Sequence, residues 1–156
     1  MCILVAIVAQ RQRPYAQPHM AKYVKPASNR STDIHFMSKI TTVYGIPNCD
    51  TVKKARNWLS EQGITYQFHD FKKQGVPAER LPDWMQAVGW EKLLNRQGTT
   101  WRKLDDATKA SAVDASSAAA VMQEHASTIK RPVVEWADGR ITIGFKAEEW
   151  LADLEK

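Results

Sequence analysis

The segment from residue 40 to residue 71 carries the pattern that most restricts the fold. ITTVY, residues 40–44, is β-branched and aromatic and predicts a short strand. Residues 51–62 place apolar side chains at helical spacing, and Gly63 ends the predicted helix. ITYQFHDF, residues 64–71, alternates apolar and polar side chains as a second strand does. Strand, helix and strand in this order predict a βαβ unit.

The second half of the chain predicts a helical insertion followed by a hairpin. Three stretches place apolar side chains three or four residues apart, and we expect these three stretches to hold four or fewer helical segments between them: AERLPDWMQAVG, WEKLLN and DASSAAAVMQEHA. PVVEW, residues 132–136, and RITIGF, residues 140–145, flank Ala-Asp-Gly, which predicts a hairpin, and AEEWLADLEK predicts a final amphipathic helix. The expected fold class is α/β, with a mixed β-sheet and a helical insertion between a βαβ and a ββα half.

Residues 1–36 differ in composition from the rest of the chain. They hold five Lys and Arg against one Asp, and all six tryptophans follow them. The apolar run at residues 2–9 is far shorter than the roughly 20 residues of a membrane-spanning helix, and its positive charges follow it, unlike those of a secretory signal. We expect a disordered extension before a domain over residues 37–156, with Met37 as the natural start. The alternative is an organelle transit peptide.

The net charge of +5 comes mostly from that extension. The 17 basic and 16 acidic residues that follow nearly cancel, which argues against a nucleic-acid partner. Arg96, Arg102 and Lys103 lie beside Trp101, but the leucines around them are expected to pack a helix and loop against the sheet. We expect no nucleic-acid and no membrane partner, and a monomer.

The chain holds two cysteines, Cys2 in the extension and Cys49. Two thiols so placed do not form a disulfide scaffold, which favours a reducing compartment and a cytoplasmic location. The four histidines are scattered, and no cluster of Cys and His has the spacing of a zinc site. We therefore expect no metal and no bound cofactor.

Cys49 stands where the first predicted strand breaks and the first predicted helix begins. The unpaired N–H groups of a helix N-terminus favour a thiolate and lower its pKa, and Lys53 and Lys54 add positive charge, whereas Asp50 opposes the effect. The alternative is a buried, inert cysteine. A C-x-x-C pair is absent because Val52 takes the fourth position. A reactive Cys49 would need an outside thiol, and glutathione is the abundant one in the cytosol.

The segment Ile129-Lys130-Arg131-Pro132 directly precedes a predicted strand. X-Pro is the only common context for a cis peptide bond, so Arg131–Pro132 could form a fixed turn that faces the thiol. Arg131 would then hold a thiolate, a carboxylate of glutathione or an oxyanion through its forked donors. The alternative is a surface arginine paired with a carboxylate.

Four separated motifs together resemble the ArsC/Spx/YffB family of thioredoxin-fold proteins, and the YffB branch most closely: YGIPNCDTVKKARNWL, LLNRQGTTWRKLD, DASSAAAVM and IKRPVV. The resemblance runs from about Met37 to the C-terminus. It implies a thioredoxin-like core with a helical insertion, Cys49 as the redox-active thiol, Arg131 beside it and a cis proline at Pro132.

The sequence also departs from the family's patterns. In arsenate reductases of the family, the sequence around the cysteine is similar to H-N-P-A-C-G-T-S-R. This chain has Gly45, Val52 and Lys53 in place of the histidine, serine and arginine. Of their three oxyanion-binding arginines, Arg131 matches one, while Asn95 and Gly144 fall at the others. Members of the Spx branch, which bind RNA polymerase, often carry C-x-x-C.

The predicted function is a glutathione-dependent thiol–disulfide oxidoreductase that uses a single nucleophilic cysteine. Cys49 and Arg131 are the expected catalytic residues. Six further residues are expected to bind substrate or shape the site, Asn48 as the helix cap among them: Asn48, Thr51, Lys53, Asn95, Arg96 and Pro132. The expected partners are glutathione, an oxidised thiol or small oxyanion, and glutaredoxin. The alternatives are an arsenate reductase with glutathione or glutaredoxin as reductant, and an Spx-like regulator that binds RNA polymerase.

Overall fold

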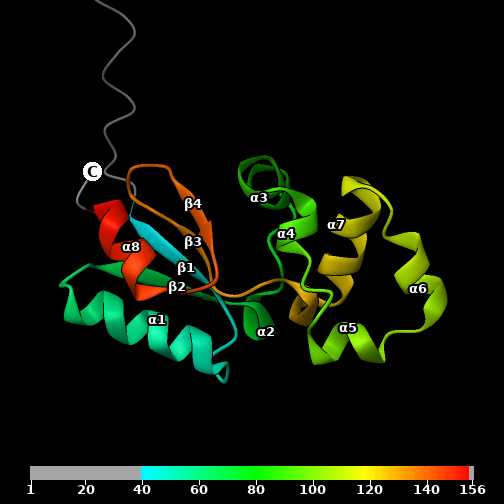
Figure 1. The fold of residues 1–156 in the computed structure, drawn as a ribbon, viewed down its shortest axis with the longest axis horizontal. Coiled ribbons are helices and arrows are strands. Elements are labelled where there is room, and N and C mark those ends of the chain that lie inside the picture. The colour runs from blue at the N-terminus through cyan, green and yellow to red at the C-terminus, as the bar shows by residue number, and fades with distance from the viewer. Residues whose placement is uncertain (1–39, 155–156) are drawn as a thin grey trace, which may run out of the picture. The chain divides into compact units, whose positions relative to one another are not determined.

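A four-stranded mixed sheet organises the computed structural model, which describes residues 40–154 (Figure 1). Its strands are β1 (Thr41–Gly45), β2 (Tyr66–Asp70), β3 (Val133–Glu135) and β4 (Ile141–Ile143), in the order β2-β1-β3-β4. β1 pairs with β2 in parallel and with β3 in antiparallel, and β4 continues the antiparallel half. This arrangement confirms the predicted βαβ unit and mixed sheet. The predicted extension over residues 1–36 lies outside the described residues.

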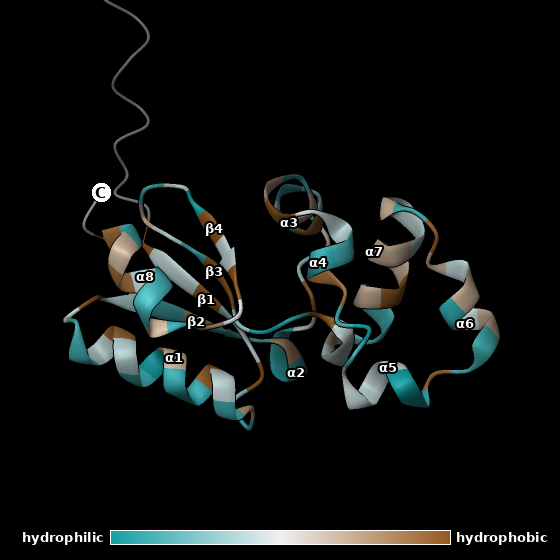
Figure 2. Cartoon of the chain, in the orientation of Figure 1, coloured by the Kyte–Doolittle hydropathy of each residue, from teal (hydrophilic) through white to brown (hydrophobic). Residues whose placement is uncertain are grey.

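Helices α1 (Asp50–Glu61) and α8 (Ala147–Leu154) cover one face of the sheet (Figure 1). α1 buries Val52, Ala55 and Leu59, which recur at helical spacing and lie on one side. Figure 2 shows both hydrophilic and hydrophobic residues along α1. Two residues of α1 and one of α8 join the strands in a single apolar cluster, whose buried members are Val43, Ala55, Leu59, Val134, Trp136 and Trp150.

The helical insertion packs on the opposite face. Its long helices are α3 (Leu81–Val88) and α7 (Ala115–Glu124), and α4 (Trp90–Leu93) lies next to both. The larger apolar cluster of the molecule joins Tyr44 and Val133 of the sheet to Leu81, Trp84, Leu93 and Met122 of the insertion. The sheet therefore carries a core on each face, and the loops at the end of β1 lie where the two layers meet.

Each of the three stretches predicted to be helical forms one helix, namely α3, α4 and α7, but the sequence pattern missed further short helices. Between β2 and β3 the structure adds α2 (Phe71–Gln74), α5 (Thr99–Lys103) and α6 (Asp106–Ser111) to α3, α4 and α7, and a 3₁₀ turn follows at Ala126–Thr128. The added helices span four to six residues, which is too short for a periodic apolar pattern. Local caps fix two of them, because Asp70 accepts a hydrogen bond from the Lys72 amide and Asp105 accepts one from the Thr108 amide.

The predicted hairpin is confirmed. β3 and β4 are antiparallel, and the Trp136 amide donates to the Arg140 carbonyl at 2.9 Å across the turn. Gly139 has φ +91° in this turn, a backbone conformation that residues other than glycine rarely adopt. The Arg131–Pro132 peptide bond before β3 is cis. Each helix within residues 40–154 is too short or too polar to span a lipid bilayer.

A partly buried polar network joins the sheet to the insertion. Glu135 of β3 accepts hydrogen bonds from Nε of Arg80 at 2.9 Å and from Nε1 of Trp84 at 2.6 Å, and it forms an ion pair with Arg80. Burial disfavours the Glu135 carboxylate, but the hydrogen bonds from Arg80 and Trp84 outweigh it and lower the pKa of Glu135. Burial, together with the negative charge of Glu135, raises the pKa of the neighbouring Tyr44 to about 12.

Candidate functional site

Cys49 occupies the N-terminus of α1, directly after the loop that leaves β1. Its carbonyl accepts a hydrogen bond from the Lys53 amide at 2.9 Å, and its own amide donates to the Ile46 carbonyl at 3.1 Å. The prediction that Asn48 caps the helix is wrong: Cys49 is the N-cap residue, no side chain caps the helix, and Asn48 is exposed. The amides of the first turn are therefore available to the sulfur.

The half-buried Cys49 thiol has a lowered pKa. Burial alone would raise that pKa, but hydrogen bonds from the backbone amides of Val52 and Thr51 stabilise the thiolate. The positive charge of Arg131 and a side-chain hydrogen bond from it lower the pKa further. Cys49 thus lies in the electropositive, partly exposed environment that is typical of reactive cysteines.

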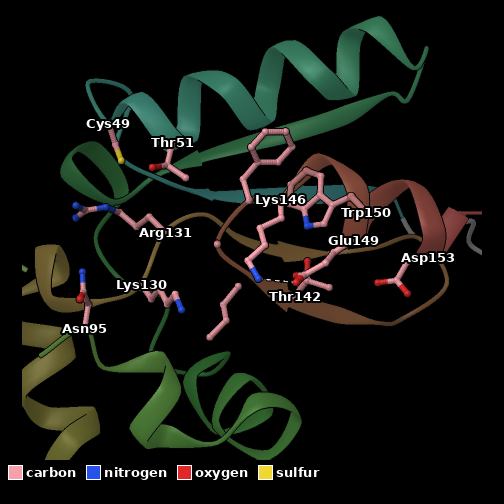
Figure 3. A pocket seen from close by; sticks show the side chains of 13 residues that line it. Cys49, Thr51, Asn95, Lys130, Arg131, Thr142, Lys146, Glu149, Trp150 and Asp153 are labelled. Atoms are coloured by element: carbon pink, nitrogen blue, oxygen red, sulfur yellow. Dashed lines mark hydrogen bonds and ion pairs between the residues drawn. The ribbon is translucent and has the colours of Figure 1, made fainter. Parts of the chain in front are cut away.

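Arg131 precedes the cis peptide bond and points toward the Cys49 end of the site (Figure 3). Its Nε and Nη1 atoms are buried and have no hydrogen-bond partner among residues 40–154. Buried donors without partners cost free energy, so these two atoms favour an acceptor that enters from outside. A carboxylate or another oxyanion fits the planar fork of a guanidinium.

Cys49 and Arg131 line a cavity of about 450 Å³ between the N-terminus of α1, the segment before β3 and the start of α8 (Figure 3). Four of the eight predicted site residues meet there: Cys49, Thr51, Asn95 and Arg131. Asn95 reaches the cavity from the insertion because an isolated β-bridge joins Leu94 to Ile129. A cavity of this size suits a small organic ligand.

The other predicted site residues lie elsewhere. Lys53 is exposed and forms an ion pair with Asp50 at 3.9 Å. Arg96 lines a neighbouring hollow of about 390 Å³, donates to the Ala112 carbonyl at 3.1 Å and lies over the ring of Trp90 at 5.4 Å. Pro132 is fully buried. Arg96 therefore holds the insertion together in this structure.

Several cavity residues were not among the predicted site residues, although the resemblance had placed Gly144 at an arginine position of the family. They come from β4, α8 and the segments beside them: Lys130, Thr142, Ile143, Gly144, Phe145, Lys146, Glu149, Trp150 and Asp153. Lys130 could have been found from its place next to Arg131. The residues of β4 and α8 carry no local signal, because only the tertiary fold brings them within reach of Cys49. Within residues 40–154, no three His, Cys, Asp or Glu side chains cluster as a metal site would require.

Loss of Arg131 is expected to raise the pKa of Cys49. In Cys2→Ser protein, Arg131→Ala removes a charge and a hydrogen bond that favour the thiolate, so less thiolate exists at pH 7 and the pH midpoint of alkylation by iodoacetamide moves upward. Lys54→Met is the matched control, because Lys54 is exposed and its substitution removes one positive charge from α1, as Arg131→Ala removes one from the cavity. A midpoint that moves as far in Lys54→Met as in Arg131→Ala would contradict a specific role for Arg131.

Gly45 and Val52 form a close steric pair beneath the site. A Cβ atom at residue 45 would lie 2.9 Å from Cγ2 of the fully buried Val52. Gly45→Ala is therefore expected to lower the free energy of unfolding by about 1–3 kcal/mol, measured by urea denaturation. In a Val52→Ala background the same change should cost much less. Equal costs in both backgrounds would show that this contact is not the cause.

Comparison with known proteins places the chain in a family. Residues 44–152 match the model of the ArsC family. The chain belongs to the ArsC family. A protein from Haemophilus influenzae described as uncharacterized is 42% identical over 111 residues, which cover 71% of this chain and 96% of the relative. The predicted family is thereby confirmed for most of the described residues.

Solved structures of ArsC relatives support the same conclusion. An arsenate reductase-related protein from Brucella melitensis is 49% identical, covers 76% of this chain and 98% of its own, and superposes with a TM-score of 0.58. A YFFB protein is 47% identical, and the match covers 72% of this chain and 96% of that protein, with a TM-score of 0.68. These neighbours confirm the thioredoxin-like fold and support an oxidoreductase of the thiol reductase class.

A second branch of ArsC relatives is more distant. The global transcriptional regulator Spx from Streptococcus agalactiae is 26% identical over 117 residues, which cover 74% of this chain and 83% of that protein. The chain is therefore related to regulators as well as to arsenate reductase-like proteins.

Proposed function

We propose that this protein is a glutathione-dependent thiol–disulfide oxidoreductase with Cys49 as its single nucleophile. The Cys49 thiolate attacks one sulfur of a substrate disulfide, the S–S bond breaks, and the departing thiolate takes up a proton. A glutathione thiolate then attacks the resulting mixed disulfide, and Cys49 leaves as a thiolate. A second glutathione completes the exchange, so two glutathiones supply two electrons and end as glutathione disulfide.

The observation that carries this proposal is the shared position of Cys49 and Arg131 in one cavity. The lowered pKa of Cys49 raises the fraction of attacking thiolate at neutral pH and makes Cys49 a better leaving group in the second step. Arg131 offers buried donors to a carboxylate of the incoming thiol. Thr51 and Asn95 line the same cavity and provide polar contacts. We place the reaction in the cytoplasm, where glutathione is abundant and thiols stay reduced.

The direct test is reduction of 2-hydroxyethyl disulfide by glutathione with the full chain, coupled to NADPH oxidation by glutathione reductase. We expect turnover that requires both protein and glutathione, and a glutathione adduct on Cys49 that mass spectrometry detects when glutathione disulfide is added. Absence of both the turnover and the adduct would refute the proposal. Whether glutaredoxin serves as reductant is tested separately, by adding reduced glutaredoxin without free glutathione to the glutathione adduct of Cys49 and following release of the thiol.

Arsenate reduction is the related alternative. Asn95 and Gly144 line the same cavity as Arg131. By the resemblance, they stand at two positions where arsenate reductases of the family carry arginine. A tetrahedral oxyanion would thus meet one guanidinium where three are expected. We therefore expect arsenate, supplied with glutathione and glutaredoxin, to give far less product than a disulfide. Arsenite formation at a comparable rate would favour the alternative.

A regulator that docks on RNA polymerase is the other candidate, favoured by the relationship to Spx. Such a protein would use the fold as a binding surface and would not need the thiol. Recovery of RNA polymerase from lysate, equally by wild type and by Cys49→Ser protein and together with absent disulfide turnover, would favour this function over the reductase.

A further inference from the structure

The charged side chains that line the Cys49 cavity are unequally paired. Both acids have partners, because Glu149 accepts a hydrogen bond from Nζ of Lys146 at 2.6 Å and Asp153 lies 3.8 Å from Nη1 of Arg140. Lys130 and Arg131 form no ion pair with any of residues 40–154. Lys130 therefore has no carboxylate partner among these residues, and Arg131, whose charge favours the Cys49 thiolate, keeps two buried donors, Nε and Nη1, without a hydrogen-bond partner.

The Lys130 side chain has a defined path into this cavity. Its backbone amide donates to the Leu93 carbonyl at 2.8 Å, which fixes the residue next to the insertion. Its Cε atom lies 3.6 Å from the place of a Cβ atom at Gly144. The aliphatic stem of Lys130 thus packs along the space that the absent side chain of Gly144 leaves open, and the exposed ammonium group extends beyond it.

Lys130 and Arg131 point in different directions. Figure 3 shows the guanidinium of Arg131 directed toward the Cys49 end of the cavity, whereas the ammonium of Lys130 is directed away from that end. One small anion such as phosphate or arsenate cannot use both groups while they diverge in this way. A ligand with two separated negative charges satisfies both.

We propose that the cavity recognises a small thiol that carries two separated carboxylates, and that Lys130 binds the carboxylate that Arg131 does not reach. This inference rests on the proposed function, since glutathione belongs to this class of thiol. Arg131 lies beside the Cys49 sulfur and orients the carboxylate nearer to it. Lys130 supplies a point charge on a flexible side chain for the second carboxylate. Lys130 is a specificity-determining residue that discriminates dicarboxylate thiols from neutral ones, without contact to the reacting sulfurs.

The test measures the rate at which an added thiol enters the cavity and attacks a Cys49 mixed disulfide, independently of turnover. Cys2→Ser protein is converted to the Cys49 mixed disulfide with thionitrobenzoate. An added thiolate attacks the Cys49 sulfur, the S–S bond to the aromatic group breaks, and thionitrobenzoate leaves as a coloured thiolate. Lys130→Met is expected to slow release by glutathione about fivefold at low ionic strength and to leave release by 2-mercaptoethanol unchanged within about twofold. High salt should shrink the loss with glutathione.

Lys92→Met is the matched control, because Lys92 is exposed and lines the neighbouring hollow instead of the Cys49 cavity. It should change release by glutathione by less than about twofold. Equal losses in the Lys92 and Lys130 variants, or equal losses with both thiols, would overturn the inference. So would unchanged release by glutathione in Lys130→Met. If wild type prefers glutathione through Lys130 but shows no catalytic turnover, the recognition site stands and the proposed function fails.

Discussion

Serine in place of Cys49 is expected to abolish glutathione-dependent disulfide reduction. The hydroxyl group does not ionise near neutral pH, and an oxygen cannot form the mixed disulfide that the second thiol resolves. The structure offers no replacement, since Cys49 is the only cysteine among residues 40–154 and Val52 stands where a resolving thiol of a C-x-x-C motif would be. The rate should fall by more than about a thousandfold, to the uncatalysed background.

Cys2→Ser protein is the control for that result and should keep full turnover, measured in the same coupled assay. Because the serine hydroxyl is close in size to the thiol, Cys49→Ser should fold normally, which circular dichroism and urea denaturation can verify. A folded Cys49→Ser protein with more than a few per cent of wild-type turnover would exclude Cys49 as the nucleophile.

Alanine in place of Trp84 is expected to cost about 3–5 kcal/mol of the free energy of unfolding. Trp84 is completely buried in α3, its ring centre lies 4.8 Å from that of Tyr44 of the sheet, and its Nε1 atom donates to Glu135. Removal of the indole leaves a large cavity between sheet and insertion and takes one hydrogen bond from the partly buried Glu135 carboxylate.

Trp84→Phe separates these two causes. Phenylalanine retains much of the apolar volume but has no N–H group, so we expect a smaller loss, of about 1–2 kcal/mol. Urea denaturation followed by circular dichroism at 222 nm measures both variants. Equal losses in Trp84→Ala and Trp84→Phe would mean that the hydrogen bond to Glu135, and not packing, dominates at this position.

The sheet, the longer helices and the hairpin could be predicted because each carries its own periodicity or turn signal. α1 buries Val52, Ala55 and Leu59 as the sequence pattern requires, and Ala-Asp-Gly connects β3 and β4. α5 and α6 could not be predicted, because they are one to two turns long and depend on packing and on local caps such as that of Asp105.

The site could be predicted only in part. The thiol at a strand–helix junction and the Arg-Pro segment before a strand are local signals, and the structure brings Cys49 and Arg131 into one cavity. Lys146 and Glu149 could not be placed there from sequence, because they lie about a hundred residues from Cys49 and only the sheet brings α8 close. Arg96 lies outside this cavity, with its guanidinium over Trp90, and its predicted ligand contact stays a prediction.

The contact between Gly45 and Val52 also restricts the order in which this site can change during evolution. A side chain of any kind at position 45 collides with Val52, so a substitution there is selected against while valine is present. A smaller residue at position 52 removes the collision and makes position 45 accessible. The path from this chain to one with a functional side chain at position 45 therefore begins at position 52, where a single substitution alters no polar group of the cavity.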